Sequence, residues 1–189
     1  MHLSSDEPGP TRPTQQQGPR FAPFVDEHDN VEQLTELCHR AYAEHAAQGR
    51  RFFGSYQSVE HTRRRVLDGE CWVAVVDGEF VGTVTVSGPG GFPDGYPAAP
   101  QAGRFSQLAV DPTWRGTGLG HALLVHAERR LAERGCDAVV IDTSSAADEL
   151  LAWYWRRGYT VVGRWTWSVT NYDSTVLRKE LPAVDGRGD

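Results

Sequence analysis

The chain is 189 residues long, with a hydrophobic fraction of 39%, a charged fraction of 23% and a formal net charge of −6 at pH 7. The length suits one domain, and the fractions are those of a soluble globular protein. The negative charge argues against nucleic acid as a main partner, because binding to nucleic acid relies on a basic surface. No apolar run approaches the roughly 18 residues of a membrane span, so a membrane partner is not expected either.

The cysteines are Cys38, Cys71 and Cys136, an odd and widely spaced set. They show no metal-ligand spacing, so we expect reduced thiols. The N-terminal segment lacks a basic stretch followed by an apolar one, so no signal peptide is expected. Together these features predict a cytoplasmic protein.

Composition divides the chain into three parts. Residues 1–19 are rich in Pro, Gln, Gly and Ser with almost nothing apolar, which predicts a disordered N-terminal lead. Residues 182–189 predict a disordered tail. Residues 20–181 form the expected single domain between them, and they contain no internal repeat.

Local signals in the first half of this domain indicate a strand, two helices and a β-hairpin. Asp29 is the expected cap of a helix whose apolar residues recur at helical spacing from Val31. Ser58 resembles the N-cap of a second helix, and Asp77-Gly78 is a strong signal for a two-residue hairpin turn. The expected strands cover residues 20–25, 71–76 and 79–86, and the expected helices cover 31 to about 49 and 59–67.

The second half begins with a glycine- and proline-rich loop at residues 87–103, and loops of this length are uncommon unless they are functional or mobile. Strands are expected at 104–110, 137–142, 160–168 and 172–180, with helices at 119–134 and 146–157. The resulting order is β-α-α-β-β-β-α-β-α-β-β. It predicts an α/β (α+β) fold in which a mixed central sheet has helices on both faces.

The run Arg115-Gly116-Thr117-Gly118-Leu119-Gly120 stands between the strand at 104–110 and the next helix. Glycine lets the backbone approach a ligand closely, and the start of a helix presents unpaired N–H groups and the positive end of its dipole. Together they suit a phosphate or diphosphate; the alternative is a glycine-rich turn without a ligand. A P-loop is excluded because no Lys-Ser or Lys-Thr follows. A dinucleotide fingerprint is excluded because His121 or Leu123 occupies its third glycine position.

The spacing of Arg115, Gly118 and Gly120 resembles the diphosphate-binding signature of the GNAT superfamily of N-acyltransferases. That signature is Arg or Gln, two residues, Gly, one residue, then Gly or Ala. The preceding segment, residues 108–112, resembles the lead-in of the same family. A second match lies in residues 154–159, where a tyrosine is followed four residues later by glycine and then by an aromatic. The resemblance covers about residues 20–181, and the order of elements is also that of the superfamily.

The resemblance implies that acetyl-CoA or CoA is bound as the acyl donor, without a metal. The amides of the glycine run would cradle the diphosphate. The pantetheine arm would add to the strand at residues 107–110, where this strand splays from residues 137–142, and a main-chain N–H near Leu108 would polarise the thioester carbonyl. The expected donor-binding residues are Leu108, Ala109, Val110, Arg115, Gly116, Thr117, Gly118, Leu119, Gly120 and His121. Arg115 either adds positive charge at the diphosphate or pairs with a neighbour.

Tyr154 is the expected general acid. A phenol has a pKa of about 10 and a thiol a pKa of about 8.5, so a protonated tyrosine can give its proton to the departing thiolate. The alternative is an aromatic residue in the apolar face of a helix, beside Leu150 and Leu151. The spacing to Gly158 and the upstream glycine run favour the catalytic role.

Ala147 departs from the resembled family, which often has an asparagine at this position, seven residues before the tyrosine, in contact with the cofactor. Either Ser144 or Ser145 substitutes for it, or the contact is absent. Whether this contact is present affects the details of CoA binding and does not affect the class of protein.

The general base is open. Some members of the family use a glutamate on the strand before the glycine run, and this strand has no carboxylate. Glu70, Asp94, Asp142 and a chain of water molecules all remain candidates. His121 and His126 do not share a helix face well and have no third ligand in view, so no metal site is expected.

The acceptor pocket is expected to involve the first two helices and the loop at residues 87–103. Residues 50–56 are rich in arginine and aromatics, and they either grip an acidic or aromatic acceptor or pack as a turn. Arg63, Arg64 and Arg65 point in different directions on a helix, so a solvated face is expected for this basic run.

The leading hypothesis is an N-acetyltransferase that moves an acetyl or small acyl group from coenzyme A to a primary amine. Direct attack in a ternary complex is favoured, because no cysteine lies near the glycine run or Tyr154 in sequence. A small-molecule amine is the expected acceptor, and the family suggests a homodimer through the C-terminal strands. The rival is a non-catalytic module that binds acyl-CoA to regulate or dock a partner. A nucleotide hydrolase is disfavoured by the absent P-loop lysine.

Overall fold

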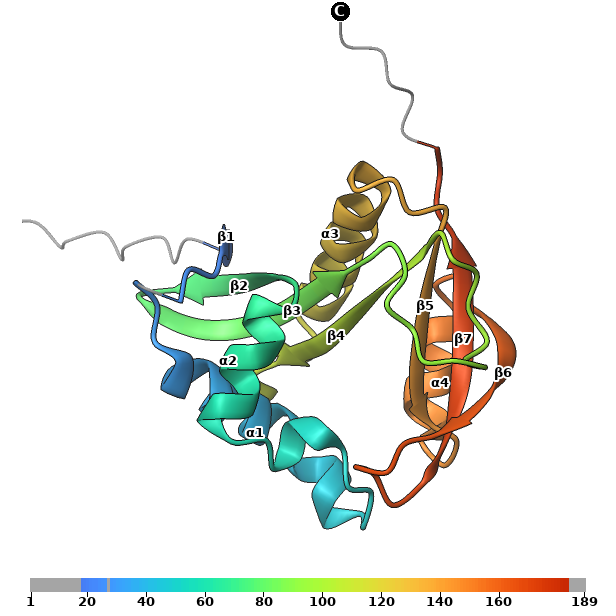
Figure 1. Ribbon diagram of the computed structural model, residues 1–189. Coiled ribbons are helices and arrows are strands. Elements are labelled where there is room, and N and C mark those ends of the chain that lie inside the picture. Colours follow the sequence, from blue (N-terminus) through green and yellow to red (C-terminus); the bar gives the residue numbers. More distant parts are fainter. Residues whose placement is uncertain (1–17, 27, 184–189) are drawn as a thin grey trace, which may run out of the picture.

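Seven strands form one mixed sheet, in the order β1-β2-β3-β4-β5-β7-β6, in the computed structural model, which describes residues 18–26 and 28–183 (Figure 1). The strands are β1 Arg20–Pro23, β2 Glu70–Val76, β3 Glu79–Ser87, β4 Ala102–Val110, β5 Ala138–Ser144, β6 Thr160–Thr166 and β7 Asp173–Glu180. The helices are α1 Val31–Ala47, α2 Val59–Leu67, α3 Leu119–Glu133 and α4 Asp148–Trp155, with 3-10 turns at Phe53–Ser55 and Pro112–Trp114. The predicted order of strands and helices is confirmed.

The sheet is antiparallel from β1 to β4 and again from β5 through β7 to β6. The turn between β2 and β3 has Asp77 at φ 51° and Gly78 at φ 85°. Positive φ at both central residues is the requirement of a type I′ hairpin, so the predicted Asp77-Gly78 turn is confirmed.

The two halves of the sheet are joined by a short parallel contact and then diverge. β4 pairs with β5 only through Ala102 with Ala138 and Gly103 with Val139. Beyond these pairs the two strands separate, and Figure 1 shows β4 and β5 opening away from each other like the arms of a V. The splay predicted from the family resemblance is therefore present. It leaves backbone groups on one side of β4 without a strand partner.

The caps of the first two helices are explained by local side chains. Asn30 caps α1, with its Oδ1 accepting a 2.9 Å hydrogen bond from Gln33 N. The expectation that Asp29 is the cap is wrong, because its carboxylate accepts from Val25 N in the preceding turn. Ser58 caps α2 as predicted, and His61 completes a capping box with it.

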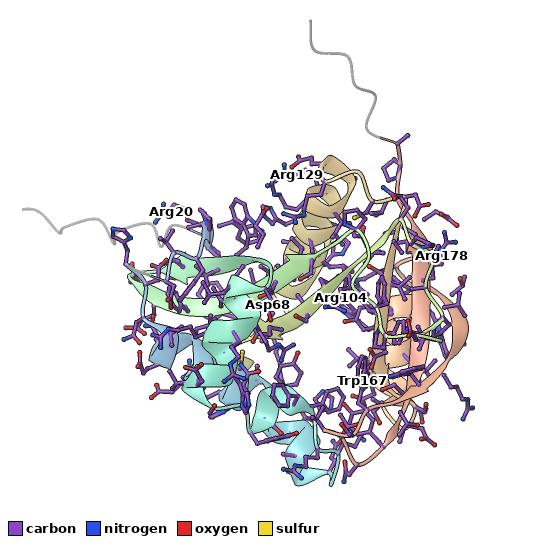
Figure 2. All side chains as sticks on the ribbon, in the orientation of Figure 1. Arg20, Asp68, Arg104, Arg129, Trp167 and Arg178 are labelled. Carbon is purple, nitrogen blue, oxygen red and sulfur yellow. The ribbon has the colours of Figure 1, made fainter. Side chains whose placement is uncertain are left out.

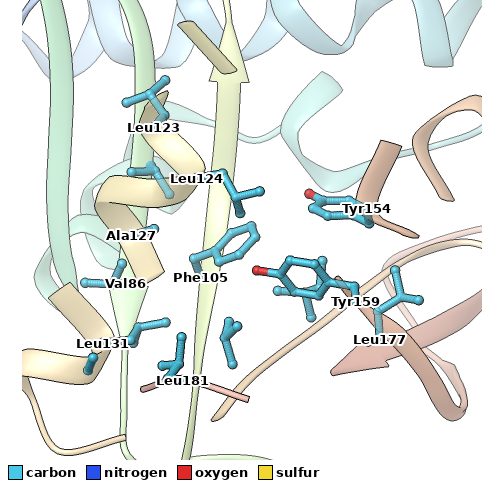
Figure 3. Close-up of a cluster of buried hydrophobic side chains, with 14 of the residues drawn as sticks. Val86, Phe105, Leu123, Leu124, Ala127, Leu131, Tyr154, Tyr159, Leu177 and Leu181 are labelled. Carbon is cyan, nitrogen blue, oxygen red and sulfur yellow. The ribbon is translucent and has the colours of Figure 1, made fainter. Parts of the chain in front are cut away.

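The helices cover both faces of the sheet. α1 and α2 lie on one face and bury Leu34, Leu37 and Val66 against β2 and β3, and α3 and α4 lie on the other face (Figure 1). Figure 3 shows Leu123 and Leu124 of α3 in the main core, which β4 and β5 share. Burying such a side chain fully is worth about 1.5–3 kcal/mol, so this core holds α3 firmly behind the splayed strands.

The expected disordered lead and tail fall mostly outside the described residues, which leave out 1–17 and 184–189. Within the described part of the chain, no helix has both the length and the apolar character needed to span a bilayer. β4 begins at Ala102, two residues earlier than predicted, because Ala102 and Gly103 pair with β5.

Candidate active site

A cavity of about 1210 Å³ lies where β4 and β5 diverge. It is lined by the end of α1 and the turn after it, by β4, by the glycine turn that opens α3, by the end of β5, by α4, and by parts of the loop at residues 88–101. The charged side chains on its wall include Arg65, Asp68, Arg104, Asp142 and Arg157. A space of this size is large enough for an extended cofactor together with a small second substrate.

The glycine turn lies at one end of the cavity. Gly116 has φ 76° and Gly118 has φ 91°, a left-handed conformation that other residues adopt only with strain. The first backbone hydrogen bond into α3 runs from Ala122 N to Gly118 O. Within the described residues the N–H groups of Gly120 and His121 have no acceptor. Two backbone donors and the positive end of a helix thus face the same space.

Gly120 has room for a side-chain carbon at this turn. A Cβ added there would lie 3.6 Å from Val110 Cγ2 and 3.8 Å from Trp153 Cζ2, which is ordinary contact distance. Gly120 is therefore replaceable by alanine on steric grounds. Gly116 and Gly118 have open space around them, and what restricts them is their backbone conformation.

Most of the expected donor-binding residues line this cavity. They are Leu108, Ala109, Val110, Arg115, Gly116, Gly118, Gly120 and His121. Thr117 and Leu119 do not line it. The Thr117 hydroxyl donates to Trp114 O at 2.7 Å, so it stabilises the turn from within, and the Leu119 side chain is buried in the core.

Arg115 pairs with α1. Its guanidinium donates to Glu44 Oε2 at 2.5 Å and to Ala41 O at 2.7 Å. Of the two possibilities for this residue, pairing with a neighbour is the one present, although Arg115 also lines the cavity. Both partners are largely exposed, and an ion pair of this kind contributes little stability, so Arg115 can exchange Glu44 for an anionic ligand at small cost.

β4 has a β-bulge in its central part. Thr83 of β3 faces Ala109, whereas Thr85 faces Ser106, so β4 contains one extra residue between these pairs. Gln107 absorbs the extra length with φ 53°. The Leu108 carbonyl accepts a 2.9 Å hydrogen bond from the Tyr42 hydroxyl. Sequence reasoning missed Tyr42, which is one of several residues on the α1 face that recur at helical spacing.

Tyr154 projects from α4 toward β4 and lines the cavity (Figure 3). Only 6% of the residue is exposed, and its ring packs against Tyr159, with 5.3 Å between ring centroids. No hydrogen bond to its hydroxyl is found within the described residues. Burial raises the pKa of this phenol far above its usual value, so it is protonated throughout the physiological range.

The start of α4 has no side-chain cap. Ala147 occupies the N-cap position and lines the cavity. Ser144 Oγ accepts from Ala146 N at 3.3 Å, and Ser145 Oγ lies 2.8 Å from Thr175 Oγ1. Both serines are therefore engaged within the protein.

The three candidate carboxylates lie in different places. Glu70 binds Arg130 on the opposite side of the sheet, at 2.6 Å and 2.9 Å, and this ion pair is the main reason why its pKa is lowered to about 2. Asp94 is exposed and is not part of the cavity wall. Asp142 does line the cavity, where it accepts from the Tyr96 hydroxyl at 3.0 Å and from Trp167 Nε1 at 2.8 Å.

The basic run on α2 differs from the prediction. Arg63 and Arg64 form surface ion pairs with Asp26 and Glu60, but Arg65 is half-buried and turns into the cavity. The expectation of a solvated face is wrong for this residue. Helical spacing would have revealed it, because Arg65 lies three residues after the buried Thr62 and next to the buried Val66.

Residues 50–56 mostly pack. Phe52 is buried and stacks on His45, with 4.4 Å between ring centroids, and Gly54 lies against the ring of Tyr42. Arg50 is bound to α1 and to the Ala146 carbonyl. Phe53 is also part of the cavity wall, together with Arg50, Phe52 and Gly54.

The cysteines lie away from the cavity wall, and all three are buried free thiols. Burial raises the pKa of Cys38 to about 12 and also raises the pKa of Cys71. Because the thiolate is the nucleophile, neither is suited to attack a thioester. In the part of the chain that the structure describes, no three His, Cys, Asp or Glu side chains are grouped closely enough to hold a metal ion.

Comparisons with known proteins agree with this arrangement. A family model described as "Acetyltransferase (GNAT) family" matches residues 29–159. The fold is similar to the ribosomal-protein-S18-alanine N-acetyltransferase from Escherichia coli, with TM-score 0.65, 14% identity, and 90% of this chain and 99% of that chain covered. It is also similar to a GNAT family acetyltransferase from Elizabethkingia anophelis with acetyl-CoA bound, with TM-score 0.61, 16% identity, and 87% and 99% covered. An acetyltransferase from Bacillus subtilis in complex with CoA gives TM-score 0.60, 16% identity, and the same coverage.

Proposed function

Because the chain belongs to the acetyltransferase (GNAT) family and is therefore an acyltransferase, we propose that it moves an acetyl or small acyl group from coenzyme A to a primary amine. The observation that carries this proposal is one continuous cavity. It contains the free amides of the glycine turn, the unpaired side of β4 and the Tyr154 side chain. These are the groups needed to hold a thioester donor and to protonate its leaving thiolate.

The donor is held mainly by backbone. The N–H groups at residues 116–121 bind the CoA diphosphate, which the start of α3 favours electrostatically. The pantetheine arm lies along β4, where β5 has diverged, and uses backbone groups that no strand occupies. The Leu108 N–H polarises the thioester carbonyl and stabilises the oxyanion that develops there. Because Ala147 offers no polar side chain, these backbone contacts supply most of the affinity.

Tyr154 is the general acid. Its burial favours the neutral phenol, and its hydroxyl is free to donate to the sulfur as the thiolate departs. Proton transfer by a positioned side chain contributes about 10²–10⁴-fold to a rate. The neighbouring Tyr159 has a different role, because its hydroxyl donates to Glu128 at 2.9 Å within the core.

The amine must lose a proton before it attacks, and Asp142 is the candidate base. It is the one of the three candidate carboxylates that lies on the cavity wall. Its contacts with Tyr96 and Trp167 use one site on each oxygen, whereas a carboxylate offers about four acceptor sites. The remaining sites can accept from the ammonium group directly or through water.

The amine attacks the thioester directly, in a ternary complex. The buried thiols with raised pKa values support this route over an acyl-cysteine. A small-molecule acceptor is favoured, because the loop at residues 88–101 folds over the sheet, with Pro97 against Gly163, and forms part of the cavity wall.

The expected homodimer stays a prediction. β6 is an edge strand with Val161 and Val162 exposed, and sedimentation would test whether the protein is a dimer.

The experiment combines calorimetry with a thiol-release assay. We expect acetyl-CoA to bind, thiol release to depend on an added amine, and initial-rate lines to intersect as a ternary complex requires. Parallel lines would indicate an acyl-enzyme. Tight acetyl-CoA binding with no turnover on a broad amine panel would favour the rival, a non-catalytic acyl-CoA-binding module. Absence of any CoA binding would refute the proposal.

A further inference from the structure

Two arginines line the acceptor end of the cavity without an acidic partner. Arg65 reaches it from α2 and Arg104 from β4. Within the described residues, no carboxylate oxygen lies within 4.0 Å of a nitrogen of either side chain. Asp68 also lines the cavity and is outside this distance. By contrast, Arg63 and Arg64, the neighbours of Arg65 on α2, both form ion pairs.

Neutral groups hold each guanidinium in place. Arg65 donates to Gln57 Oε1 at 2.9 Å, and Gln57 is fully buried, with its amide donating to Thr62 and Gln107. Arg104 donates to the Gly91 carbonyl at 2.7 Å. A guanidinium has five N–H donors, so each side chain is fixed in position with most of its donors still available.

The backbone brings the two arginines together. Arg104 pairs across the sheet with Ser87 of β3. Gly69, which follows the end of α2, packs against Ser87 so closely that an added Cβ would lie 2.7 Å from Ser87 Oγ. The segment that follows α2 and the start of β4 therefore both adjoin Ser87, which also lines the cavity. Asp68, Arg104 and Trp167 all line the cavity, and Figure 2 labels their positions on the ribbon.

Keeping two positive charges near each other in a partly buried position costs electrostatic free energy. Burial lowers the pKa of Arg65, and the nearby charge of Arg104 lowers it further. An anion bound between them would remove this repulsion and would satisfy the free donors. Arginine is suited to this task because its planar fork matches the geometry of carboxylate and phosphate groups.

The opposite charge lies across the cavity. Asp142 is held on the β5 side by Tyr96 and Trp167, and it is close enough to Tyr154 to contribute to the raised pKa of that phenol. The negative group thus lies toward the expected acid, where the amine must react. The two arginines lie on the α2 and β4 side.

We propose that the acceptor is an amine that also carries an oxyanion, either a carboxylate or a phosphate, and that Arg65 and Arg104 bind the oxyanion while the amine lies near Asp142. This inference rests on the proposed function and names the substrate class of the same site. The net charge of −6 would by itself favour a cationic acceptor such as a polyamine. The inference disfavours a polyamine, because it would bring further positive charge toward both arginines. The rings of Phe53, Phe92 and Tyr96 provide an apolar wall between the two ends.

The test uses pairs of amines that differ only in the acid. Amino acids are compared with their amides, and phosphoethanolamine with ethanolamine, so that the pairs also separate carboxylate from phosphate. Transfer is measured as kcat/KM in the thiol-release assay, and binding is measured by calorimetry on protein loaded with CoA. We expect at least one acid-bearing amine to exceed its neutral twin by tenfold or more. If neutral amines or polyamines match or exceed the acid-bearing ones in both measurements, the inference is overturned while the proposed function stands.

Two substitutions locate the effect. Arg65→Gln and Arg104→Gln should each lower kcat/KM for the acid-bearing amine by about tenfold, which corresponds to about 1.4 kcal/mol, and change the neutral twin by less than about twofold. Arg104→Lys should recover part of the loss. Arg64→Gln, one residue away in an exposed ion pair, is the control and should change neither. Equal losses of kcat/KM for the acid-bearing amine and its neutral twin would mean that the arginines act only in folding. If the unmodified protein does not bind acetyl-CoA, the proposed function itself is refuted.

Discussion

The hydroxyl of Tyr42 on α1 donates a 2.9 Å hydrogen bond to the carbonyl oxygen of Leu108, which follows Gln107 in the bulge of β4 and whose N–H is proposed to polarise the thioester. This contact joins α1 to the strand along which the donor is proposed to lie. Gly54 permits it, because a Cβ at that position would lie 2.6 Å from Tyr42 Cδ2.

Removing this hydrogen bond should affect both stability and turnover. Tyr42→Phe leaves a carbonyl without its partner, so we expect the free energy of unfolding to fall by about 1 kcal/mol. Because β4 is then less well fixed, kcat should also fall, by several-fold. Urea titration and the thiol-release assay measure the two effects. An unchanged kcat alongside reduced stability would show that the contact is purely structural.

Tyr154→Phe should lower kcat by roughly 10²-fold or more and leave the calorimetric Kd of acetyl-CoA nearly unchanged. The reason is that the substitution removes a proton donor and keeps the ring that packs against Tyr159. Tyr159→Phe is the matched control, because Tyr159 lies in the core and its hydroxyl binds Glu128. That control should lose stability and retain turnover. If Tyr154→Phe instead abolishes acetyl-CoA binding, the acid role assigned to it is wrong.

The glycine turn offers a pair of variants with opposite expected outcomes. Gly118→Ala forces a residue with a side chain into φ 91°, which costs about 1–2 kcal/mol, so the turn should shift and the Kd for CoA should rise about tenfold. Gly120→Ala meets only ordinary contacts, at 3.6 Å and 3.8 Å, and should bind CoA normally. Calorimetry on both variants decides the matter, and equal affinities would show that the left-handed residue is unimportant for the donor.

Asp142→Asn should lower kcat/KM for the amine by about 10- to 100-fold and preserve CoA binding. The amide can still contact Tyr96 and Trp167, but it cannot accept a proton from the ammonium group. Raising the pH should recover part of the activity, since more of the amine is then neutral. Asp94→Asn, in the exposed loop, is the control. A pH–rate profile identical to that of the unmodified protein would remove Asp142 from the mechanism.

The lowered pKa of Glu70 predicts that stability depends on pH, separately from any effect on catalysis. Its folded pKa is lowered to about 2 from 4.5, first by the hydrogen bonds with Arg130. A carboxyl group whose pKa is lower in the folded protein than in the unfolded chain stabilises the fold at pH values above the unfolded pKa. This stabilisation is lost as the pH falls from 4.5 toward 2. Glu70→Gln should therefore be less stable than the unmodified protein at pH 7, by roughly 1–2 kcal/mol, and the difference should shrink through this window. A difference that is constant with pH, measured by urea titration, would contradict the ion-pair explanation.

Local signals in the sequence predicted much of the fold. The glycine turn before α3, the N-cap at Ser58 and the Asp77-Gly78 hairpin depend on a few neighbouring residues, so their sequence pattern is enough to identify them. The cap of α1 was misplaced by one residue, because Asp29 and Asn30 are both good caps and only the turn at Val25 decides between them.

The sequence by itself determined the order of strands and helices, the glycine turn before α3 and the placement of a tyrosine on α4. Only the tertiary structure decided that Arg115 pairs with Glu44, that Tyr42 meets Leu108, and that Arg65 and Arg104 line the same cavity. The reason is physical: turns and caps are set by bonds between neighbours in the chain, whereas these contacts join residues dozens of positions apart. Their geometry follows from how α1 and α2 pack against the sheet, and no local pattern encodes that packing.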